Sequence, residues 1–343
     1  MPNSKKITVA DIARQAGVSV ATVSNAINNT GRMSEQTRER VQTAMKELGF
    51  VRNYSAAKLR SGRSHLVGVL VQDLSNPLYS EFASALEAEL SAHGYMPILA
   101  NIGEDLERQD QLLGELIGHG VAGVVVTPVA RSVATQFDAI VQRQLPCITM
   151  MREVEGLAAD FIGIDDFHGG YLVGEHLVQL GHHRFAMIAG LEGTTTARLR
   201  GAGFLAALSE AGIPAEQVVS LHSEPTREGG ELTARKLLQQ DLGFSALFCH
   251  NDIMAIGASV ALRDIAGIGA RKIALAGFDN LEVSAMWQPS LTTVETSAQA
   301  LGKDVGALLI ARLNGETGVP VRRRRKPKLV VRDSTFALRE ETL

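Results

Sequence analysis

From residue 64 onward, short apolar runs alternate with stretches that fit helices, and this alternation restricts the fold more than any other feature. The apolar runs lie at 66–71, 96–100, 121–126, 147–150, 161–164, 185–189, 246–249 and 273–276. The helical stretches lie at 79–93, 108–119, 133–143, 170–180, 200–211, 228–239 and 253–265. Continuous apolar runs are typical of buried parallel strands, and strands that alternate with helices build doubly wound sheets. The pattern predicts an α/β fold, and the break at Asp165–Asp166 divides it into two lobes.

The charge distribution separates a basic head from this acidic body. Residues 1–63 carry 4 Lys, 7 Arg and 4 acidic residues, a net charge of +7. The remaining residues carry 23 basic and 33 acidic residues, a net charge of −10. A small basic region on an acidic body indicates a polyanionic partner for the head and a different ligand for the body.

The two cysteines and the absence of a targeting segment narrow the class further. Cys147 and Cys249 each lie in an apolar run, where a cysteine is most often a small buried side chain. Two cysteines are too few for a disulfide framework or a zinc cluster. The sequence shows no signal-like apolar segment and no apolar run long enough to span a membrane. We therefore expect a cytoplasmic protein with no membrane span, metal or cofactor.

The basic head predicts three short helices. Thr8 can cap a helix over 9–16, Gly17 can end it in the left-handed conformation, and Ser19 can cap a second helix over 20–28. A third helix follows Ser34 and stops at Gly49. The apolar positions at helical spacing are Val9, Ile12, Ala13, Ala16, Val23, Ile27, Val41, Ala44, Met45 and Leu48. A tight turn between the first two helices predicts a helix-turn-helix, whose second helix enters the major groove of DNA.

The second helix of the head presents small side chains, which let a helix approach base edges closely. Serine and threonine hydroxyls can bond phosphates, and Asn25 can read an adenine edge through two hydrogen bonds. The candidate DNA contacts of the head are Thr8, Ser19, Val20, Ala21, Thr22, Ser24, Asn25 and Asn28. An ordinary helical hairpin is the alternative, and it leaves the charge of +7 unexplained.

These residues resemble the headpiece of the lactose-repressor family. The resemblance rests on 7–28, continues through 34–41 and 47–53, and extends along nearly the whole chain. Many members carry arginine where this sequence has Asn25, so the resemblance leaves the operator sequence open. It implies a repressor with a helix-turn-helix headpiece and a periplasmic-binding-protein-like core of two lobes. The implied boundaries are 1–52 for the headpiece, 53–63 for a hinge helix and linker, and 64–343 for the core, with lobe 1 at 64–164 and 295–325 and lobe 2 at 165–294 and 326–343.

The resemblance also implies a role for the hinge helix, which would lie in the minor groove when two subunits meet. The candidate contacts there are Asn53, Ala56, Lys58 and Leu59, with Leu59 wedged into the central base step. A plain linker helix is the alternative. The tail after Arg332 is too short for a tetramerising coiled coil, so the sequence favours a homodimer on a pseudo-palindromic operator.

In such a core, small ligands bind between the lobes at the carboxyl ends of strands. The candidate effector contacts are Asn76, Tyr79, Thr194, Arg198, Arg200, Asn251 and Asp279. Arg198 and Arg200 can recognise hydroxyl or carboxylate groups through forked donors. The resemblance implies ligand contact for Arg200, Asn251 and Asp279, and the alternative for each candidate is a strand-end cap or a surface charge.

Three positions depart from the family pattern. Met150–Arg152 replaces a common aspartate, Glu224 replaces a stacking aromatic, and Ser297–Ala298 replaces a phenylalanine or tryptophan. Fewer aromatic planes and two candidate arginines favour a sugar or a sugar acid over a purine as the effector. Lac-type members lose DNA on binding ligand and purine-type members gain it, so the resemblance leaves the direction of the response open.

Two other function classes fit the sequence less well. A solute-binding protein of sugar uptake would need a secretion signal and no basic head. An enzyme would need a phosphate loop or a catalytic set, and the G-x-G-x-x-G match at 118–123 precedes a predicted strand instead of following one. His182 and His183 lack further ligands at metal spacing. The basic run at 322–328 is interpreted as a solvated face, with phosphate contacts or a partner surface as the alternatives.

Overall fold

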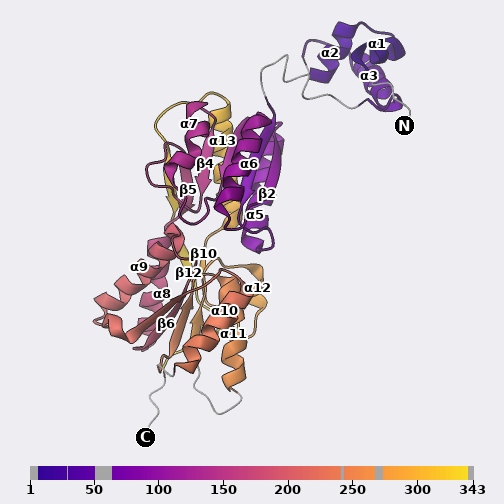
Figure 1. The fold of residues 1–343 in the computed structure, drawn as a ribbon. Coiled ribbons are helices and arrows are strands. Elements are labelled where there is room, and N and C mark those ends of the chain that lie inside the picture. The colour runs from indigo at the N-terminus through magenta and orange to yellow at the C-terminus, as the bar shows by residue number, and fades with distance from the viewer. Residues whose placement is uncertain (1–6, 29, 51–63, 241–242, 267–272, 339–343) are drawn as a thin grey trace. The chain divides into compact units, whose positions relative to one another are not determined.

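The computed structural model describes residues 7–28, 30–50, 64–240, 243–266 and 273–338, and the chain divides into compact units at 1–63 and 64–343. Helices α1 (Val9–Ala16), α2 (Val20–Asn28) and α3 (Glu35–Glu47) make up the first unit (Figure 1). Their apolar faces meet around the fully buried Ile12, Val23 and Val41, as the helical spacing predicts.

The predicted start and end of α1 are confirmed. The Thr8 hydroxyl accepts from the Asp11 amide at 3.3 Å, and the Asp11 carboxylate accepts from the Thr8 amide at 3.0 Å, which completes a capping box. Gly17 ends α1 with φ of 63°, a conformation that favours glycine. Arg40 of α3 donates to the Ala16 carbonyl at 2.5 Å, so its guanidinium satisfies an end of α1.

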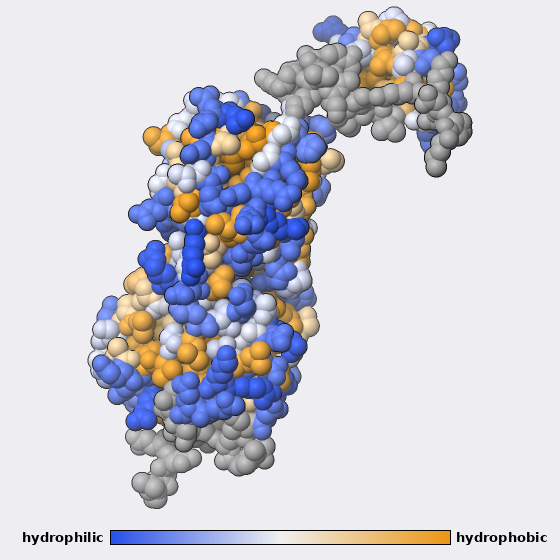
Figure 2. All heavy atoms as spheres, viewed as in Figure 1, coloured by the Kyte–Doolittle hydropathy of each residue, from blue (hydrophilic) through white to orange (hydrophobic). Residues whose placement is uncertain are grey.

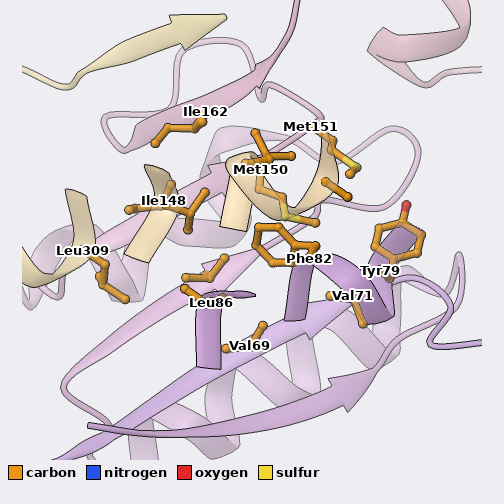
Figure 3. Close-up of a cluster of buried hydrophobic side chains, with 14 of the residues drawn as sticks. Val69, Val71, Tyr79, Phe82, Leu86, Ile148, Met150, Met151, Ile162 and Leu309 are labelled. Carbon is orange, nitrogen blue, oxygen red and sulfur yellow. The ribbon is translucent and has the colours of Figure 1, made fainter. Parts of the chain in front are cut away.

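Lobe 1 of the second unit is built on a parallel six-stranded sheet in the order β11-β5-β4-β3-β1-β2. Its strands are β1 (Leu66–Val71), β2 (Met96–Asn101), β3 (Gly123–Val126), β4 (Cys147–Met150), β5 (Asp160–Ile164) and β11 (Arg322–Arg325). Its helices are α5 (Pro77–Ala92), α6 (Leu106–Gly118), the short η1 (Ala134–Phe137), α7 (Asp138–Gln142) and α13 (Ala298–Leu313). One apolar core, shown in Figure 3, packs the α5 and α13 side chains Phe82, Leu86 and Leu309 against β1 and β4.

Lobe 2 has a parallel four-stranded sheet in the order β7-β6-β8-β9. Its strands are β6 (Phe185–Ala189), β7 (Val218–His222), β8 (Ala246–Cys249) and β9 (Ala274–Ala276). Its helices are α8 (Asp166–Gln179), α9 (Thr195–Glu210), the short η2 (Ala215–Gln217), α10 (Arg227–Gln239), α11 (Asp252–Ala266) and α12 (Glu282–Met286). The two-sheet α/β architecture predicted from the apolar runs is therefore confirmed.

The chain passes between the lobes three times, after β5, after β10 (Thr293–Glu295) and between β11 and β12 (Lys328–Val330) (Figure 1). Strands β10 and β12 pair with each other in antiparallel fashion. Helix α13 returns to lobe 1, where it packs on α5, and β12 leads back to α8 of lobe 2. These crossovers follow the path that the family resemblance implies.

Most of the basic run is exposed, in agreement with its interpretation as a solvated face, and part of the run also forms a strand. Residues 322–325 form β11, an edge strand that pairs with β5. Arg322 and Arg324 bind Glu153, and Arg325 binds Asp304 at 2.6 Å. Charged side chains on an edge strand discourage further strand pairing, so the run closes this side of the sheet.

Helices α8 and α9 cross at very close range, and both begin earlier than predicted because Asp165 and Thr194 cap them. A Cβ added to Gly203 would lie 1.8 Å from the Phe167 carbonyl oxygen, which is rigid backbone.

Gly203→Ala should therefore lower the free energy of unfolding, measured in a urea titration, by about 1–3 kcal/mol or more. Gly114→Ala, in α6 with nothing within 4 Å of the added Cβ, should raise it by up to about 1 kcal/mol. Equal effects of the two substitutions would show that the crossing is not tight.

Residue His182 links the end of α8 to the C-terminal segment and makes stability depend on pH. Its Nε2 donates to the Phe336 carbonyl at 3.0 Å, and its Nδ1 lies 2.8 Å from the Ser245 hydroxyl. Burial lowers the pKa of His182, with a smaller contribution from the charge of His183. The unfolded chain then binds more protons, so this contribution is complete above the ordinary histidine pKa of about 6.5 and is lost as the pH falls through it.

We therefore expect the contribution of His182 to the free energy of unfolding to fall between about pH 7.5 and pH 5.5, by at most about 1.4 kcal/mol per pH unit. Urea titrations at several pH values measure this slope. His182→Gln should flatten it, whereas His183→Gln, at an exposed position, should change it little. A slope that His182→Gln leaves unchanged would contradict this assignment.

Candidate functional site

A cavity of about 280 Å³ lies between the two lobes. Lobe 1 contributes the segments after β1, β2 and β4, and lobe 2 contributes the start of α9 and the segments after β7, β8 and β9. The lining residues are Gln72, Asp73, Asn76, Leu78, Tyr79, Asn101, Gly103, Glu104, Met151, Arg152, Thr196, Arg200, Glu224, Pro225, Thr226, His250, Asn251 and Asp279. The carboxyl ends of parallel strands are where ligands bind in folds of this kind.

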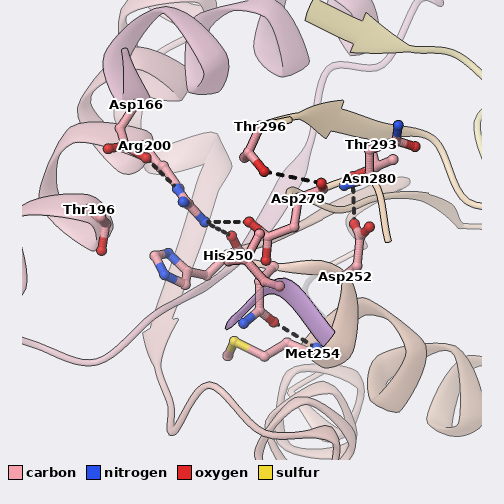
Figure 4. Close-up of polar contacts among 12 residues, drawn as sticks. Asp166, Thr196, Arg200, His250, Asp252, Met254, Asp279, Asn280, Thr293 and Thr296 are labelled. Carbon is pink, nitrogen blue, oxygen red and sulfur yellow. Dashed lines mark hydrogen bonds and ion pairs between the residues drawn. The ribbon is translucent and has the colours of Figure 1, made fainter. Parts of the chain in front are cut away.

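Arg200 of α9 is the centre of the polar contacts in lobe 2 (Figure 4). Its Nε donates to Asp166 at 2.8 Å, and its Nη1 donates to the His250 carbonyl at 2.6 Å. The guanidinium also lies 3.7 Å from the centre of the Phe278 ring. Only 8% of the side chain is exposed, so these contacts fix its position, and the two hydrogen bonds use two of its five N–H donors.

Asp279 carries a buried polar group of the cavity that has no hydrogen-bond partner among the described residues. Its Oδ1 is buried with no hydrogen-bond donor among the described residues, and the nearest cationic atom, Arg200 Nη1, lies 3.8 Å away. Burial raises the pKa of Asp279 well above its usual range, although the Arg200 charge opposes this. Its φ of 115° is rare for a non-glycine residue. A buried, strained and unsatisfied carboxyl group at a cavity is typical of a ligand contact.

Lobe 1 contributes a second buried ion pair to the cavity. Arg152 Nη1 lies 2.9 Å from Glu104 Oε2, and Arg152 Nη2 lies 2.8 Å from Glu104 Oε1. Arg152 also donates to the Pro128 carbonyl, and Glu104 accepts from the Ala130 amide. Both cavity arginines therefore already hold a carboxylate of their own lobe.

Five of the predicted effector contacts meet at this cavity: Asn76, Tyr79, Arg200, Asn251 and Asp279. The Asn251 Oδ1 accepts from the Met254 amide at 2.8 Å, which leaves its amide nitrogen for a ligand. Burial raises the pKa of Tyr79 to about 12, so its hydroxyl stays protonated and can donate.

Two of the predicted effector contacts do not line the cavity. Thr194 caps α9 by accepting from the Ala197 amide at 3.2 Å, and it donates to the Leu191 carbonyl. Arg198 is exposed on another face of α9, because Thr196 and Arg200, four residues apart, occupy the face toward the cavity. Ser297–Ala298 line a different hollow beside Asp279.

Sequence reasoning missed several lining residues. Asn101 is the last residue of strand β2 and His250 directly follows β8, so the rule that ligands bind at the carboxyl ends of strands could have found them. Glu104 gives no local signal, since its position depends on Arg152, which lies 48 residues further along the chain.

Helix α2 carries the candidate DNA contacts of the first unit. Val20, Ala21 and Asn25 are exposed, with Val20 52% exposed, and Ser24 is half-buried on the same side of the helix. The Ser19 hydroxyl caps α2 by accepting from the Thr22 amide at 3.1 Å, and Thr8 caps α1. The Asn28 side chain and the hinge candidates Asn53, Ala56, Lys58 and Leu59 lie outside the described residues.

Two further searches cover the described part of the chain. No group of three or more His, Cys, Asp or Glu side chains there has a metal-binding arrangement. None of its helices is long and apolar enough to cross a membrane.

A helix-turn-helix unit followed by a two-lobed unit with an interlobe cavity defines a class, the ligand-responsive DNA-binding regulators. Residues 8–53 match the bacterial regulatory proteins of the lacI family, and residues 64–327 match the periplasmic binding proteins and sugar binding domain of the LacI family. The chain belongs to the LacI family and is a DNA-binding transcriptional regulator.

Individual relatives agree with this assignment. The chain is 32% identical to the HTH-type transcriptional regulator DegA of Bacillus subtilis, over 97% of this chain and 99% of DegA. It resembles the lac repressor dimer bound to operator and the anti-inducer ONPF with a TM-score of 0.85 and 27% identity, over 97% of this chain and all of that one. It resembles the complex of the regulator CelR with cellobiose with a TM-score of 0.71 and 28% identity, over 96% of this chain and 99% of that one.

Proposed function

We propose that this protein is a cytoplasmic repressor that binds a pseudo-palindromic operator as a homodimer and responds to a neutral sugar. We infer the chemical class of the effector from one observation, the ion pairing of the two arginines that line the cavity. Arg152 is paired with Glu104 and Arg200 with Asp166, so neither has a free positive charge for an acid. The resemblance to a cellobiose complex supports a sugar.

Two carboxyl groups of the cavity have no close ionic partner. The Asp279 carboxyl group lacks a hydrogen-bond donor, and the structure gives Glu224, an exposed lining residue, no ion pair within the described ranges. A sugar hydroxyl can donate to either group, whereas the carboxylate of a sugar acid would be repelled. We therefore narrow the expected effector from a sugar or sugar acid to a neutral sugar.

A thermal-shift panel tests this class. Aldoses and disaccharides should raise the unfolding temperature of the protein, and the matching uronic acids and sugar phosphates should raise it less. Asn251→Ala should weaken the response to the active sugar at least tenfold, because it removes an amide donor. Stabilisation by acids alone, or by nucleobases alone, would exclude the neutral sugar while leaving DNA binding intact.

An exposed strand edge supports the homodimer. Strand β2 is the edge of the lobe 1 sheet, and its Met96, Ile98 and Leu99 are 51%, 37% and 39% exposed. Exposed apolar side chains on an unpaired edge mark an interaction surface. The similarity to a lac repressor dimer agrees with this proposal.

The role that we assign to the core is to bind the sugar without converting it. Sugar that is recovered unchanged after incubation with the protein would agree with this role.

Asn25 provides the test of base reading in the head. The Thr30 hydroxyl lies 3.4 Å from Asn25 Oδ1, and the side chain is exposed on α2. Asn25→Ala should weaken operator binding by about 1–3 kcal/mol and relax specificity at one base position, with the salt dependence unchanged. Fluorescence anisotropy against single-base operator variants measures this. Gln36→Ala, at an exposed position of α3, is the control, and equal losses for both variants would exclude base reading by Asn25.

A further inference from the structure

A second cavity of about 280 Å³, here called the hinge pocket, lies beside the first crossover between the lobes. Lobe 1 contributes Glu153, Phe161 and Arg324, and lobe 2 contributes Phe167, Arg198 and Leu199. A molecule in this pocket would contact both lobes at once.

Helix α9 separates the hinge pocket from the effector cavity. Thr196 and Arg200 line the effector cavity, whereas Thr195, Arg198 and Leu199 line the hinge pocket. Residues three and four apart share a helix face, so these two sets occupy different faces of the first turns of α9. The hinge pocket is therefore distinct from the effector cavity, although Met151 lines both.

Two charged residues that line the hinge pocket have no ion pair within the described ranges, the cation Arg198 and the carboxylate Asp165. Glu153 is held by Arg322 and Arg324, and Asp166 by Arg200. Asp165 accepts from the His168 amide at 3.0 Å. Across the described ranges, the structure gives the Arg198 guanidinium neither a hydrogen bond nor an ion pair, although Arg198 is exposed and lines the pocket.

A polar group and an apolar wall accompany this cation. The Thr195 Oγ1 is shielded from solvent and has no hydrogen-bond partner among the described residues, which is unusual for a buried hydroxyl. Phe161 is buried beneath the Arg324 guanidinium, 5.1 Å from its ring centre, and Phe167 is 42% exposed. An apolar cavity of roughly 150 Å³ is enough to hold benzene, so the space suffices for an aromatic ring.

We propose that the hinge pocket is a second ligand site, which takes a small carboxylate with an apolar or aromatic body. The carboxylate pairs with Arg198 and accepts from the Thr195 hydroxyl, since a guanidinium fork matches a carboxylate. The apolar body lies against Phe161 and Phe167. This site differs from the neutral-sugar cavity because both arginines of that cavity are paired, whereas the Arg198 guanidinium is not.

Benzoate is the probe, with benzyl alcohol as its uncharged analogue and phosphate as an anion without an apolar body. Ligand-detected NMR titration of the full-length protein should show benzoate binding at least tenfold more tightly than either control. Arg198→Gln should weaken benzoate binding at least tenfold. Arg143→Gln, which changes the charge equally at an exposed position outside the pocket, should leave it unchanged.

Two further variants locate the site. Thr195→Val removes an unsatisfied hydroxyl, so it should weaken benzoate binding severalfold without lowering the unfolding temperature. Tyr79→Phe alters the effector cavity alone and should not change benzoate binding. Benzoate binding that is absent, insensitive to Arg198→Gln, or lost in Tyr79→Phe would overturn the proposal. These experiments measure benzoate binding and do not depend on sugar or operator binding. A negative result would therefore exclude the hinge-pocket site without contradicting the proposed function.

Discussion

Replacing Arg200 with alanine should lower the free energy of unfolding of the second unit by about 3–5 kcal/mol. Arg200 is buried between Asp166, Asp279 and the His250 carbonyl, and its removal leaves two buried carboxyl groups without a cation. Burial raises the pKa of each of these carboxyl groups and the Arg200 charge opposes that rise, so the loss of Arg200 should raise both pKa values further. The same substitution should abolish the sugar response.

The single tryptophan, Trp287, gives a direct readout of this prediction. It lies after α12 in lobe 2 and donates to the Ser259 hydroxyl, so its fluorescence follows the unfolding of the second unit in urea. Arg198→Ala is a matched control two residues away on the same helix. Arg198 is exposed, and its loss should change the free energy of unfolding by no more than about 0.5 kcal/mol. Similar losses in the two variants would contradict the central position of Arg200.

Replacing Ile12 with alanine should weaken operator binding without affecting the second unit. Ile12 is completely buried between α1, α2 and α3, and removal of such a side chain costs about 2–5 kcal/mol. A unit of this size has little stability to spare, typically no more than about 3–5 kcal/mol. Where the cost exceeds this stability, the head is mostly unfolded, and we expect a loss of about tenfold in operator affinity, since tenfold corresponds to about 1.4 kcal/mol.

Anisotropy with labelled operator measures this loss, and Trp287 fluorescence in the same sample reports the second unit. The unfolding midpoint from Trp287 should match that of the unsubstituted protein. Gln42→Ala, at an exposed position of α3, should bind operator normally. Operator binding that Ile12→Ala leaves unchanged would show that the head does not need this core to hold DNA.

Local signals in the sequence were enough for much of the fold. The caps at Thr8 and Ser34, the glycine at residue 17 and the apolar runs of the two sheets each act through neighbouring residues, and the structure confirms them. Strand β11 was not predicted because four arginines do not resemble a strand, and its pairing depends on β5 and Glu153 elsewhere in the chain. Strand β7 lacks a fully buried side chain, and it too gave no continuous apolar signal.

The residues of the cavity likewise divide into those that nearby sequence could predict and those that depend on distant residues. Asn251 and Asp279 follow strands directly, so their positions could be predicted. The state of the arginines could not be predicted, because the partners of Arg152 and Arg200 are 48 and 34 residues away in the sequence. Arg198 and Arg200 look equivalent in the sequence, and only the faces of α9 assign them to different pockets. This is why the sequence left a sugar acid open and the geometry favours a neutral sugar.

The most direct test of the account is operator affinity measured with and without ligand across a range of salt concentrations. Full-length protein should prefer a palindromic duplex from its own upstream region to a scrambled duplex at every salt concentration, and the affinity should fall as salt rises. A neutral sugar should change that affinity at least tenfold, and Asn251→Ala should remove the change. A protein that binds no palindromic duplex in preference to the scrambled one, or whose operator affinity no sugar alters, would contradict the account.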